Sequence, residues 1–334
     1  MEAAESNDAL VPPSLRALLD DILDYEGLFP PAELSLSQAL HNYADYRTEP
    51  KAWLLSRFVL PVRQLPDLPP YRSLLSRGAP YRFSVLGTGG DDPETFLDRF
   101  VRDLDVLDAF DAEFGGRSQV DRMEVPLPDT LVGADQTELE SFFSSVDRRL
   151  VQTGTAKLDL FLRVPTRPAS VERLPALCAA VAEHNSQQAL PARSEMGLKL
   201  RCGGGTPEDV PSAQQVAALL VACRDAGIAF KATSGLQRPV RHYDDALDTE
   251  MHGFLNLFGG AVLAAEHQLD RDVVETILLE ETSSNFRFKK ESFSWRNLGV
   301  SLEGIRHARE SLALSFGSCS FEDPIDNLRD LDLL

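Results

Sequence analysis

From about Trp53 onward, short β-forming runs alternate with longer runs that carry the apolar spacing of amphipathic helices. This alternation predicts parallel strands joined by helical crossovers, because parallel neighbours need a long connection to return to the same edge of a sheet. Six runs have strand character: 57–62, 81–86, 121–127, 158–164, 197–202 and 228–234. Four runs between them have helical spacing: 94–114, 137–150, 171–184 and 213–226.

Two weaker runs complete the count. Residues 25–29, followed by a helical stretch at 34–46, supply a first strand, and residues 312–321 supply a last one. Eight strands in this order predict a closed (β/α)8 TIM-like barrel. The alternative is an open sheet of six or seven strands, in which residues 25–29 form only a turn.

The rhythm is interrupted before the last strand. We expect a helical region at 249–281, a hairpin at 285–295 with Lys289 and Lys290 in its turn, and a helix at 302–311. We interpret residues 1–334 as one barrel domain and residues 245–311 as an insertion within it. Such an insertion can serve as a lid, as a contact in a homo-oligomer or as structural decoration.

The charge balance limits the partners. A formal net charge of −19 repels the phosphates of nucleic acids and of anionic membranes, so we expect neither as a partner. A local basic pocket can still hold a small anionic metabolite. The four cysteines form no CxxC pair, and no leader-like or membrane-spanning apolar run is present, which together favour a reduced, cytoplasmic protein.

Glycine and hydroxyl side chains gather where the predicted strands end. In a barrel of this type the carboxyl ends of the strands carry the active site, and glycines there let backbone N–H groups approach an anion. The runs are GTGGDD (87–92), RCGGGT (201–206), TSGLQR (233–238) and FGSCS (316–320), and the alternative is that their glycines only make tight turns. The candidate binding residues are Gly203, Gly204, Ser234, Gly235, Arg238, Gly317, Ser318 and Ser320.

Two lysines, Lys199 and Lys231, lie within apolar strands. Alternation places Lys199 and Arg201 on one side of their strand, and this side should face the interior because the other packs under helices. Burial depresses the basicity of a lysine and can make it a nucleophile toward carbonyls. The alternative is a structural ion pair with Glu124 or Asp159.

Two further charged residues, Glu124 and Arg163, also lie within apolar strands. Glu124 is a candidate for proton transfer or for tuning the lysines, and Arg163 and Arg201 are candidates for binding an anion. Lys199, Lys231 and Glu124 are therefore the candidate catalytic residues.

The segments KLRCGGGTPEDV (199–210) and FKATSGLQR (230–238) resemble the sixth and seventh strand motifs of deoxyribose-phosphate aldolase and related class I aldolases, approximately VKTSTGF with ATVEDV, and VKASGGIRT. The resemblance implies that Lys199 is similar to the Schiff-base lysine and Lys231 to the second lysine that lowers its basicity. It also implies that Gly317, Ser318 and Ser320 lie where that family has a phosphate loop. Arg201 departs from the pattern, because the family has a small residue there.

The sequence thus favours a lyase or aldolase-like enzyme that acts on a small phosphorylated or carboxylated carbonyl compound and needs no cofactor or metal. One alternative is a non-catalytic barrel that binds an anionic metabolite or a protein partner. Another is a metal-dependent enzyme that uses His242, Asp244 and His252, although their spacing matches no standard zinc pattern. The common hydrolase, zincin and nucleotide-binding motifs are absent from the sequence.

Overall fold

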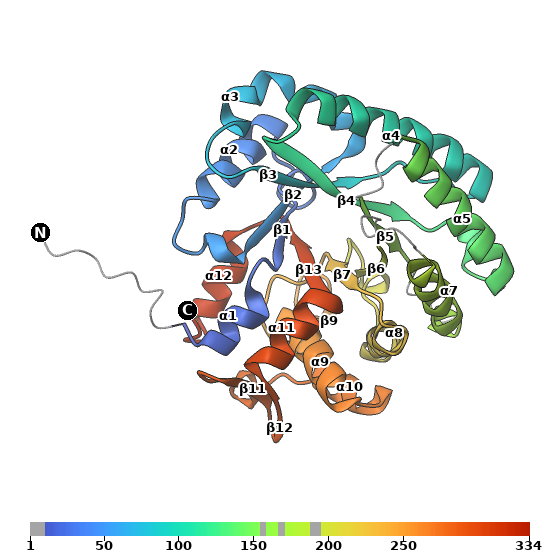
Figure 1. The fold of residues 1–334 in the computed structure, drawn as a ribbon. Helices are drawn as coiled ribbons and strands as arrows, with labels where there is room; N and C mark the ends of the chain where they lie inside the picture. Colours follow the sequence, from blue (N-terminus) through green and yellow to red (C-terminus); the bar gives the residue numbers. More distant parts are fainter. Residues whose placement is uncertain (1–10, 154–157, 166–170, 188–194) are drawn as a thin grey trace, which may run out of the picture.

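The computed structural model describes residues 11–153, 158–165, 171–187 and 195–334. Eight parallel strands form a closed barrel, as predicted, because β1 pairs with both β2 and β13 (Figure 1). The closure excludes the alternative of an open sheet. The strands are β1 (Leu23–Tyr25), β2 (Leu55–Pro61), β3 (Tyr81–Leu86), β4 (Ser118–Pro126), β5 (Asp159–Arg163), β6 (Met196–Arg201), β7 (Phe230–Thr233) and β13 (Ala313–Ser318).

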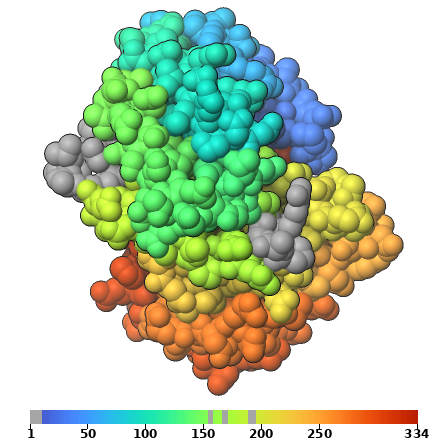
Figure 2. All heavy atoms as spheres, turned by 90° about the vertical axis from the view of Figure 1, so that its right-hand side faces the viewer, coloured from blue at the N-terminus to red at the C-terminus, as the bar shows by residue number. Residues whose placement is uncertain are grey.

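Helices form an outer wall around the strands. They are α1 (Pro13–Leu19), α2 (Leu36–Tyr46), α3 (Arg72–Leu75), α4 (Pro93–Phe114), α5 (Gln136–Thr153), α7 (Leu174–Ser186), α8 (Ala213–Ala226), α9 (Phe254–His267), α10 (Arg271–Leu278), α11 (Leu302–Ser311) and α12 (Glu322–Arg329). Figure 2 shows one side of this wall, with segments in chain order from teal to orange. No helix in the described ranges is both long enough and apolar enough to cross a membrane.

Local signals set the helix ends near the strand ends. The Asp92 side chain accepts a hydrogen bond from the Thr95 amide and caps α4, and Ser212 and Gln215 form a reciprocal capping box at the start of α8. Gly227 ends α8 with φ at +65°, a conformation that glycine adopts without strain. The two N-caps fix where the loops after β3 and β6 end, and Gly227 fixes where the connection from α8 to β7 begins.

The prediction of a first strand at 25–29 is wrong in position. The strand is Leu23–Tyr25, and the chain turns directly after it. Asp24 faces the barrel interior, where it contacts Lys231. An acidic residue between two apolar ones on so short a strand obscures the apolar pattern from which strands are recognised.

The segment between β7 and β13 also differs from expectation. Residues 249–251 are not helical but form β9 (Thr249–Met251), which pairs with β8 (His242–Asp244) in a hairpin. The rest of the expected helical region is divided into α9 and α10, because Gln268 adopts a left-handed conformation between them. The predicted hairpin is present as β10 (Phe286–Phe288) and β11 (Ser292–Trp295), and β12 (Leu298–Ser301) adds a third strand.

This three-stranded sheet packs outside the barrel wall, against α1, α9 and α11 (Figure 1). The β8–β9 hairpin instead reaches the glycines at the strand ends, because the Met251 methyl group lies against Gly203 and Gly235. The β8–β9 hairpin is therefore the part of the connection between β7 and β13 that contacts the ends of β6 and β7.

Phe258 provides a test of how the wall holds the barrel. It is fully buried on α9, and its ring lies 6.0 Å from that of Phe230 on β7 and 5.8 Å from that of Phe316 on β13. We expect Phe258→Ala to lower the free energy of unfolding by about 3–5 kcal/mol, because it leaves a cavity. Urea denaturation measures this value. The control Val151→Ala, on an exposed helix face, should change it by less than about 0.5 kcal/mol.

Candidate functional site

The interior of the barrel holds a group of paired charges where barrels usually contain branched apolar side chains. Lys199 on β6 and Lys231 on β7 lie opposite each other in register, and both side chains are buried. Glu124 on β4 contacts Lys199 through Oε2 and Lys231 through Oε1. The prediction that both lysines face inward on adjacent strands is confirmed, and the ion pair with Glu124, which was the structural alternative, is also present.

A second carboxylate, that of Asp24, also contacts Lys231 in the barrel interior. Asp24 Oδ2 on β1 lies 2.8 Å from the Lys231 ammonium and accepts a hydrogen bond from the Ser315 hydroxyl at 2.7 Å. The Ser84 hydroxyl donates to Glu124 Oε1 at 2.6 Å. Both carboxylates are thus held by several donors in the interior, and we name Asp24, Glu124, Lys199 and Lys231 the charge column.

The column sets the pKa values of its members. Burial alone would raise the pKa of Glu124, but the charges of Lys199 and Lys231 outweigh it and lower the pKa to about 2. For Asp24, burial is likewise outweighed, chiefly by Lys231, so its pKa falls well below the usual range. Both groups are therefore carboxylates at neutral pH.

The expectation of a weakly basic Lys199 is wrong in direction. Burial does act to lower its pKa, but Glu124 and then Glu26 act in the other direction, and the net pKa is raised. Lys199 therefore rests as an ammonium ion. To attack a carbonyl it must first give a proton to a neighbouring carboxylate.

Exposure rises along the column toward the mouth. Asp24, Lys231 and Glu124 are at most 2% exposed, and Lys199 is 6% exposed. Glu26, directly after β1, is partly exposed and accepts hydrogen bonds from the Thr233 hydroxyl at 2.8 and 3.0 Å. Of the two lysines, Lys199 is thus the one nearer to a solute at the mouth.

Two arginines stand at the same rim. Arg163 on β5 is in register with Lys199 and exposed, while Arg201 on β6 is half-buried and donates to the Gly203 carbonyl at 2.7 Å. Burial and the charge of Arg201 lower the pKa of Arg163. Neither guanidinium forms an ion pair with a carboxylate of the described residues. Among the described residues, these two arginines thus place positive charge at the rim without a direct ion pair.

The β6 and β7 glycine loops make close internal contacts. Gly203 and Gly235 pack against each other, where a Cβ would meet the opposing backbone. Asp209 occupies the space beside Gly204, and its Oδ2 accepts from the Gly205 and Thr206 amides at 2.9 and 3.2 Å. The chain's own carboxylate thus takes two N–H groups of the RCGGGT run, and anion binding by Gly203 and Gly204 stays a prediction.

The last strand end is arranged similarly. Gly317 lies against the Glu26 carboxylate, and a side chain at position 317 would overlap it. The Ser318 hydroxyl donates to the Ser320 carbonyl at 2.6 Å, and the Ser320 hydroxyl accepts from the Asp323 amide at 3.1 Å. The remaining candidates of the β7 loop are Ser234, half-buried with φ at +61°, and Arg238, exposed. Anion binding by these residues stays a prediction.

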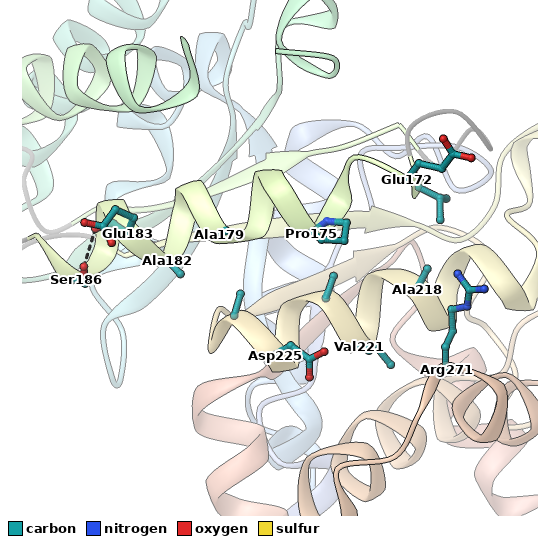
Figure 3. A pocket seen from close by; sticks show the side chains of 13 residues that line it. Glu172, Pro175, Ala179, Ala182, Glu183, Ser186, Ala218, Val221, Asp225 and Arg271 are labelled. Atoms are coloured by element: carbon teal, nitrogen blue, oxygen red, sulfur yellow. Dashed lines mark hydrogen bonds between the residues drawn. The ribbon is translucent and has the colours of Figure 1, made fainter. Parts of the chain in front are cut away.

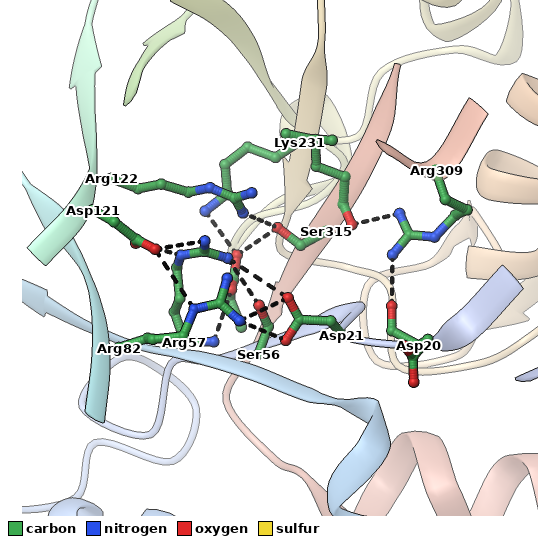
Figure 4. Close-up of polar contacts among 12 residues, drawn as sticks. Asp20, Asp21, Ser56, Arg57, Arg82, Asp121, Arg122, Lys231, Arg309 and Ser315 are labelled. Carbon is green, nitrogen blue, oxygen red and sulfur yellow. Dashed lines mark hydrogen bonds and ion pairs between the residues drawn. The ribbon is translucent and has the colours of Figure 1, made fainter. Parts of the chain in front are cut away.

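Below the charge column lies a second polar group at the amino end of the barrel (Figure 4). Arg57 pairs with Asp121 at 2.6 and 2.8 Å, and Arg82 pairs with Asp21 at 2.9 Å. Arg122 donates to the Ser315 hydroxyl, which in turn donates to Asp24. This lower group closes the interior and supports the column from beneath.

The residues of the metal alternative are engaged elsewhere. Asp244 accepts from the Ala246 and Leu247 amides, and buried His252 lies 2.7 Å from the Pro211 carbonyl through Nε2. His242 lies in the β8–β9 hairpin, with Nδ1 3.2 Å from the Val240 carbonyl. Within the described ranges, no three His, Cys, Asp or Glu side chains gather as a metal site would require.

A groove of about 850 Å³ lies on the outer face between α7 and α8 (Figure 3). Its walls are mostly small apolar side chains, such as Ala179, Ala182 and Ala218, and Glu172, Asp225 and Arg271 also line it. The lining contains no lysine, and the groove lies outside the barrel. The charge column and the arginines at its mouth are therefore the candidate site.

No family model and no curated protein match this sequence. Solved structures that match include deoxyribose phosphate aldolase from Aeropyrum pernix, described as a unique tetramer (TM-score 0.42, 12% identity, 71% of this chain and 87% of that one). A candidate deoxyribose-phosphate aldolase from Toxoplasma gondii ME49 also matches, with a TM-score of 0.47 and 10% identity over 98% of this chain and 97% of that one. A third match is the catalytic core domain of the cellobiohydrolase Cel6A from Chaetomium thermophilum, with a TM-score of 0.35 and 13% identity over 63% of this chain and 71% of that one. At these values, the reaction must be argued from the residues themselves.

The charge column predicts a distinct response to acid. The pKa of Glu124 is about 2 in the folded protein against 4.5 ordinarily, so its stabilising contribution is complete above pH 4.5 and is lost as the pH falls toward 2. Glu124→Gln should lower the free energy of unfolding by about 3–5 kcal/mol at neutral pH, because two buried ammonium groups lose their shared partner. Thermal unfolding from pH 7 to pH 2.5 measures both effects.

The variant's melting temperature should fall less steeply than that of the wild type below pH 4.5. Glu303→Gln, an exposed change on α11, is the control and should keep the wild-type slope. Equal stability and equal acid sensitivity in Glu124→Gln would contradict the role given to the column.

Proposed function

We propose that this protein is a lysine-dependent lyase of the aldolase type, in which Lys199 attacks the carbonyl carbon of a small anionic substrate. The observation that carries the proposal is the sharing of one buried carboxylate, that of Glu124, by two lysines on adjacent strands. Replacing a buried ion pair by apolar side chains is often neutral or stabilising. The cost of burying four charges is therefore better explained by chemistry than by stability.

Each member of the column has a place in this proposal. Glu124 and Glu26 are the carboxylates whose charges act most strongly on Lys199, so either can accept the proton that its ammonium group must lose. Lys231, held by Asp24 and Glu124, supplies a positive charge beside the reacting nitrogen. Lys231 thus acts on the reaction through its charge, and Lys199 forms the covalent bond with the substrate.

The rim arginines indicate the substrate class. Arg163 and Arg201 lie beside Lys199 and pair with no described carboxylate, so they can bind a carboxylate or phosphate group on the substrate. The anion then lies on the β5–β6 side of the mouth. A small carbonyl compound bearing such a group satisfies both the lysine and the arginines.

Trapping of an imine tests the lysine. The protein is incubated with sodium cyanoborohydride and, separately, pyruvate, glyceraldehyde 3-phosphate or propanal, and adducts are mapped by peptide mass spectrometry. We expect an adduct at Lys199 that is absent in Lys199→Met, and the control Lys290→Met, in an exposed turn, should retain it. Absence of any adduct at Lys199 with all three compounds would refute the proposed chemistry.

Anion binding by Arg163 and Arg201 is tested by comparing the trapping of anionic and neutral carbonyl compounds. Arg163→Gln and Arg201→Gln should each raise the pyruvate or glyceraldehyde 3-phosphate concentration for half-maximal trapping about 10- to 100-fold, the usual effect of losing a charged hydrogen bond. Propanal, which has no anionic group, should be affected little. Arg306→Gln on α11 is the control. Equal loss for charged and neutral compounds would contradict anion recognition by the rim.

The mutual pairing within the column also favours a second candidate function, a barrel that binds an anionic metabolite without converting it. In that case Lys199 stays an ammonium ion held by Glu124. Calorimetric titration would then show saturable binding of the anionic compounds that depends on Arg163 and Arg201, with no trapped adduct.

A further inference from the structure

Glu26 is a carboxylate that the charge column leaves available. It follows β1 directly and lies between the end of β7, where Thr233 donates to it, and the end of β13, where Gly317 makes room for it. Its side chain is partly exposed at the mouth. The chain therefore holds this carboxyl group in a fixed position that a bound solute can reach.

The other carboxylates of the interior have no such freedom. Glu124 receives both lysines and the Ser84 hydroxyl, and Asp24 receives Lys231, the Ser315 hydroxyl and the Arg57 amide. Of the described residues, only Thr233 donates a hydrogen bond to Glu26. Lone pairs on Glu26 thus remain for a substrate.

Four titratable groups surround Glu26, each on a different strand or strand end. They are Lys199 on β6, Lys231 on β7, Glu124 on β4 and, as a titratable group after β13, Cys319. Burial raises the pKa of Glu26, Glu124 adds to this effect, and Lys199, Thr233 and Lys231 oppose it, with a raised pKa as the result. A carboxyl group of this kind can give and take a proton nearer to neutral pH than an ordinary glutamate.

We propose that Glu26 is the group that donates and accepts protons for a carbonyl compound bound to Lys199, an inference that rests on the proposed lysine chemistry. The geometry supports it in two ways. Thr233, which donates to Glu26, lies two residues after Lys231 on β7 and therefore on the same inward face, and Glu26 is more exposed than Glu124. Because Lys231 is in register with Lys199, Glu26 is placed nearer to the strand ends than both lysines.

Glu26 changes its protonation state at each step. It first takes a proton from the Lys199 ammonium group, and the free amine then adds to the carbonyl carbon. Glu26 gives this proton to the carbonyl oxygen, which becomes a hydroxyl group, and takes one of the two protons that remain on the nitrogen. The protonated Glu26 then gives its proton to the departing hydroxyl group. The carbon–oxygen bond breaks, water leaves, and the nitrogen lone pair forms the carbon–nitrogen double bond of the iminium ion. The Glu26 carboxylate then removes a proton from the adjacent carbon, and that electron pair forms the enamine. Glu26 is thereby protonated again.

The test separates proton transfer from imine formation. Whichever of pyruvate and propanal gives the Lys199 adduct is incubated with the protein in D2O, and exchange of its α-hydrogens is followed by NMR. In Glu26→Gln we expect exchange to fall at least about 100-fold, as for loss of a general acid–base group, while cyanoborohydride still traps the Lys199 adduct. Glu208→Gln, an exposed glutamate of the β6–α8 loop, is the matched control.

Two further readings exclude a merely structural effect. The wild-type exchange rate should rise with pH through a limb above pH 4.5, where Glu26 becomes a carboxylate, and Glu26→Gln should lack this limb. Thr233→Val, which keeps the shape but removes the hydroxyl donor, should lower exchange about 10-fold and leave trapping intact. This second variant keeps the test decisive if Glu26→Gln does not fold.

The outcomes distinguish the two proposals. Trapping at Lys199 in the wild type, with exchange in Glu26→Gln and Thr233→Val within a factor of about three of wild type, overturns the role of Glu26 alone. Failure of the wild type to form any Lys199 adduct overturns the lysine chemistry and, with it, the role of Glu26.

Discussion

The bidentate sharing of Glu124 by two lysines is the interaction on which the rest of the interior depends. One carboxylate cannot neutralise two ammonium groups, so a second negative charge is needed close by, and Asp24 supplies it across the barrel from β1. This requirement joins β1, β4, β6 and β7 through side chains that are remote in sequence. The short first strand is thereby held in the barrel by charge as well as by backbone pairing.

The same principle of internal compensation explains the glycine-rich strand ends. A glycine at such a position can admit an external anion, but it can equally admit a carboxylate of the same chain. Asp209 takes the second role beside Gly204, and Glu26 takes it beside Gly317. In a protein with a net charge of −19, internal carboxylates are abundant, whereas Arg163 and Arg201 beside Lys199 form no ion pair with a described carboxylate.

The sequence was sufficient for the fold because the βα rhythm repeats over most of the chain, and it was sufficient for Lys199 and Lys231 because a charge within an apolar strand stands out. The sequence was insufficient where a charged or polar residue does not stand out from an apolar strand. Asp24 and Glu26 lie in and beside a strand of three residues, too short for alternation to mark an inward face. Ser84 and Thr233 were missed because small hydroxyl side chains are ordinary in strands, and no local pattern pairs them with Glu124 or Glu26. The Lys199 pKa is raised chiefly by Glu124, a partner that the sequence suggested, and then by Glu26, which it did not, so its direction could not follow from burial of the lysine alone.

The charged groups differ in role according to how deep they lie in the barrel. The lower group of Arg57, Asp121, Arg82 and Asp21 is mutually paired at the closed end. The column above it is also paired, through Glu124 and Asp24, whereas Arg163 and Arg201 at the mouth form no ion pair with a described carboxylate. A group that must exchange a proton with a substrate has to be desolvated enough for its pKa to shift, yet open enough for contact. Lys199 and Glu26 meet both conditions, since each has a raised pKa and lies above Glu124 toward the open end. Chemistry is therefore expected at the boundary between the paired interior and the cationic rim.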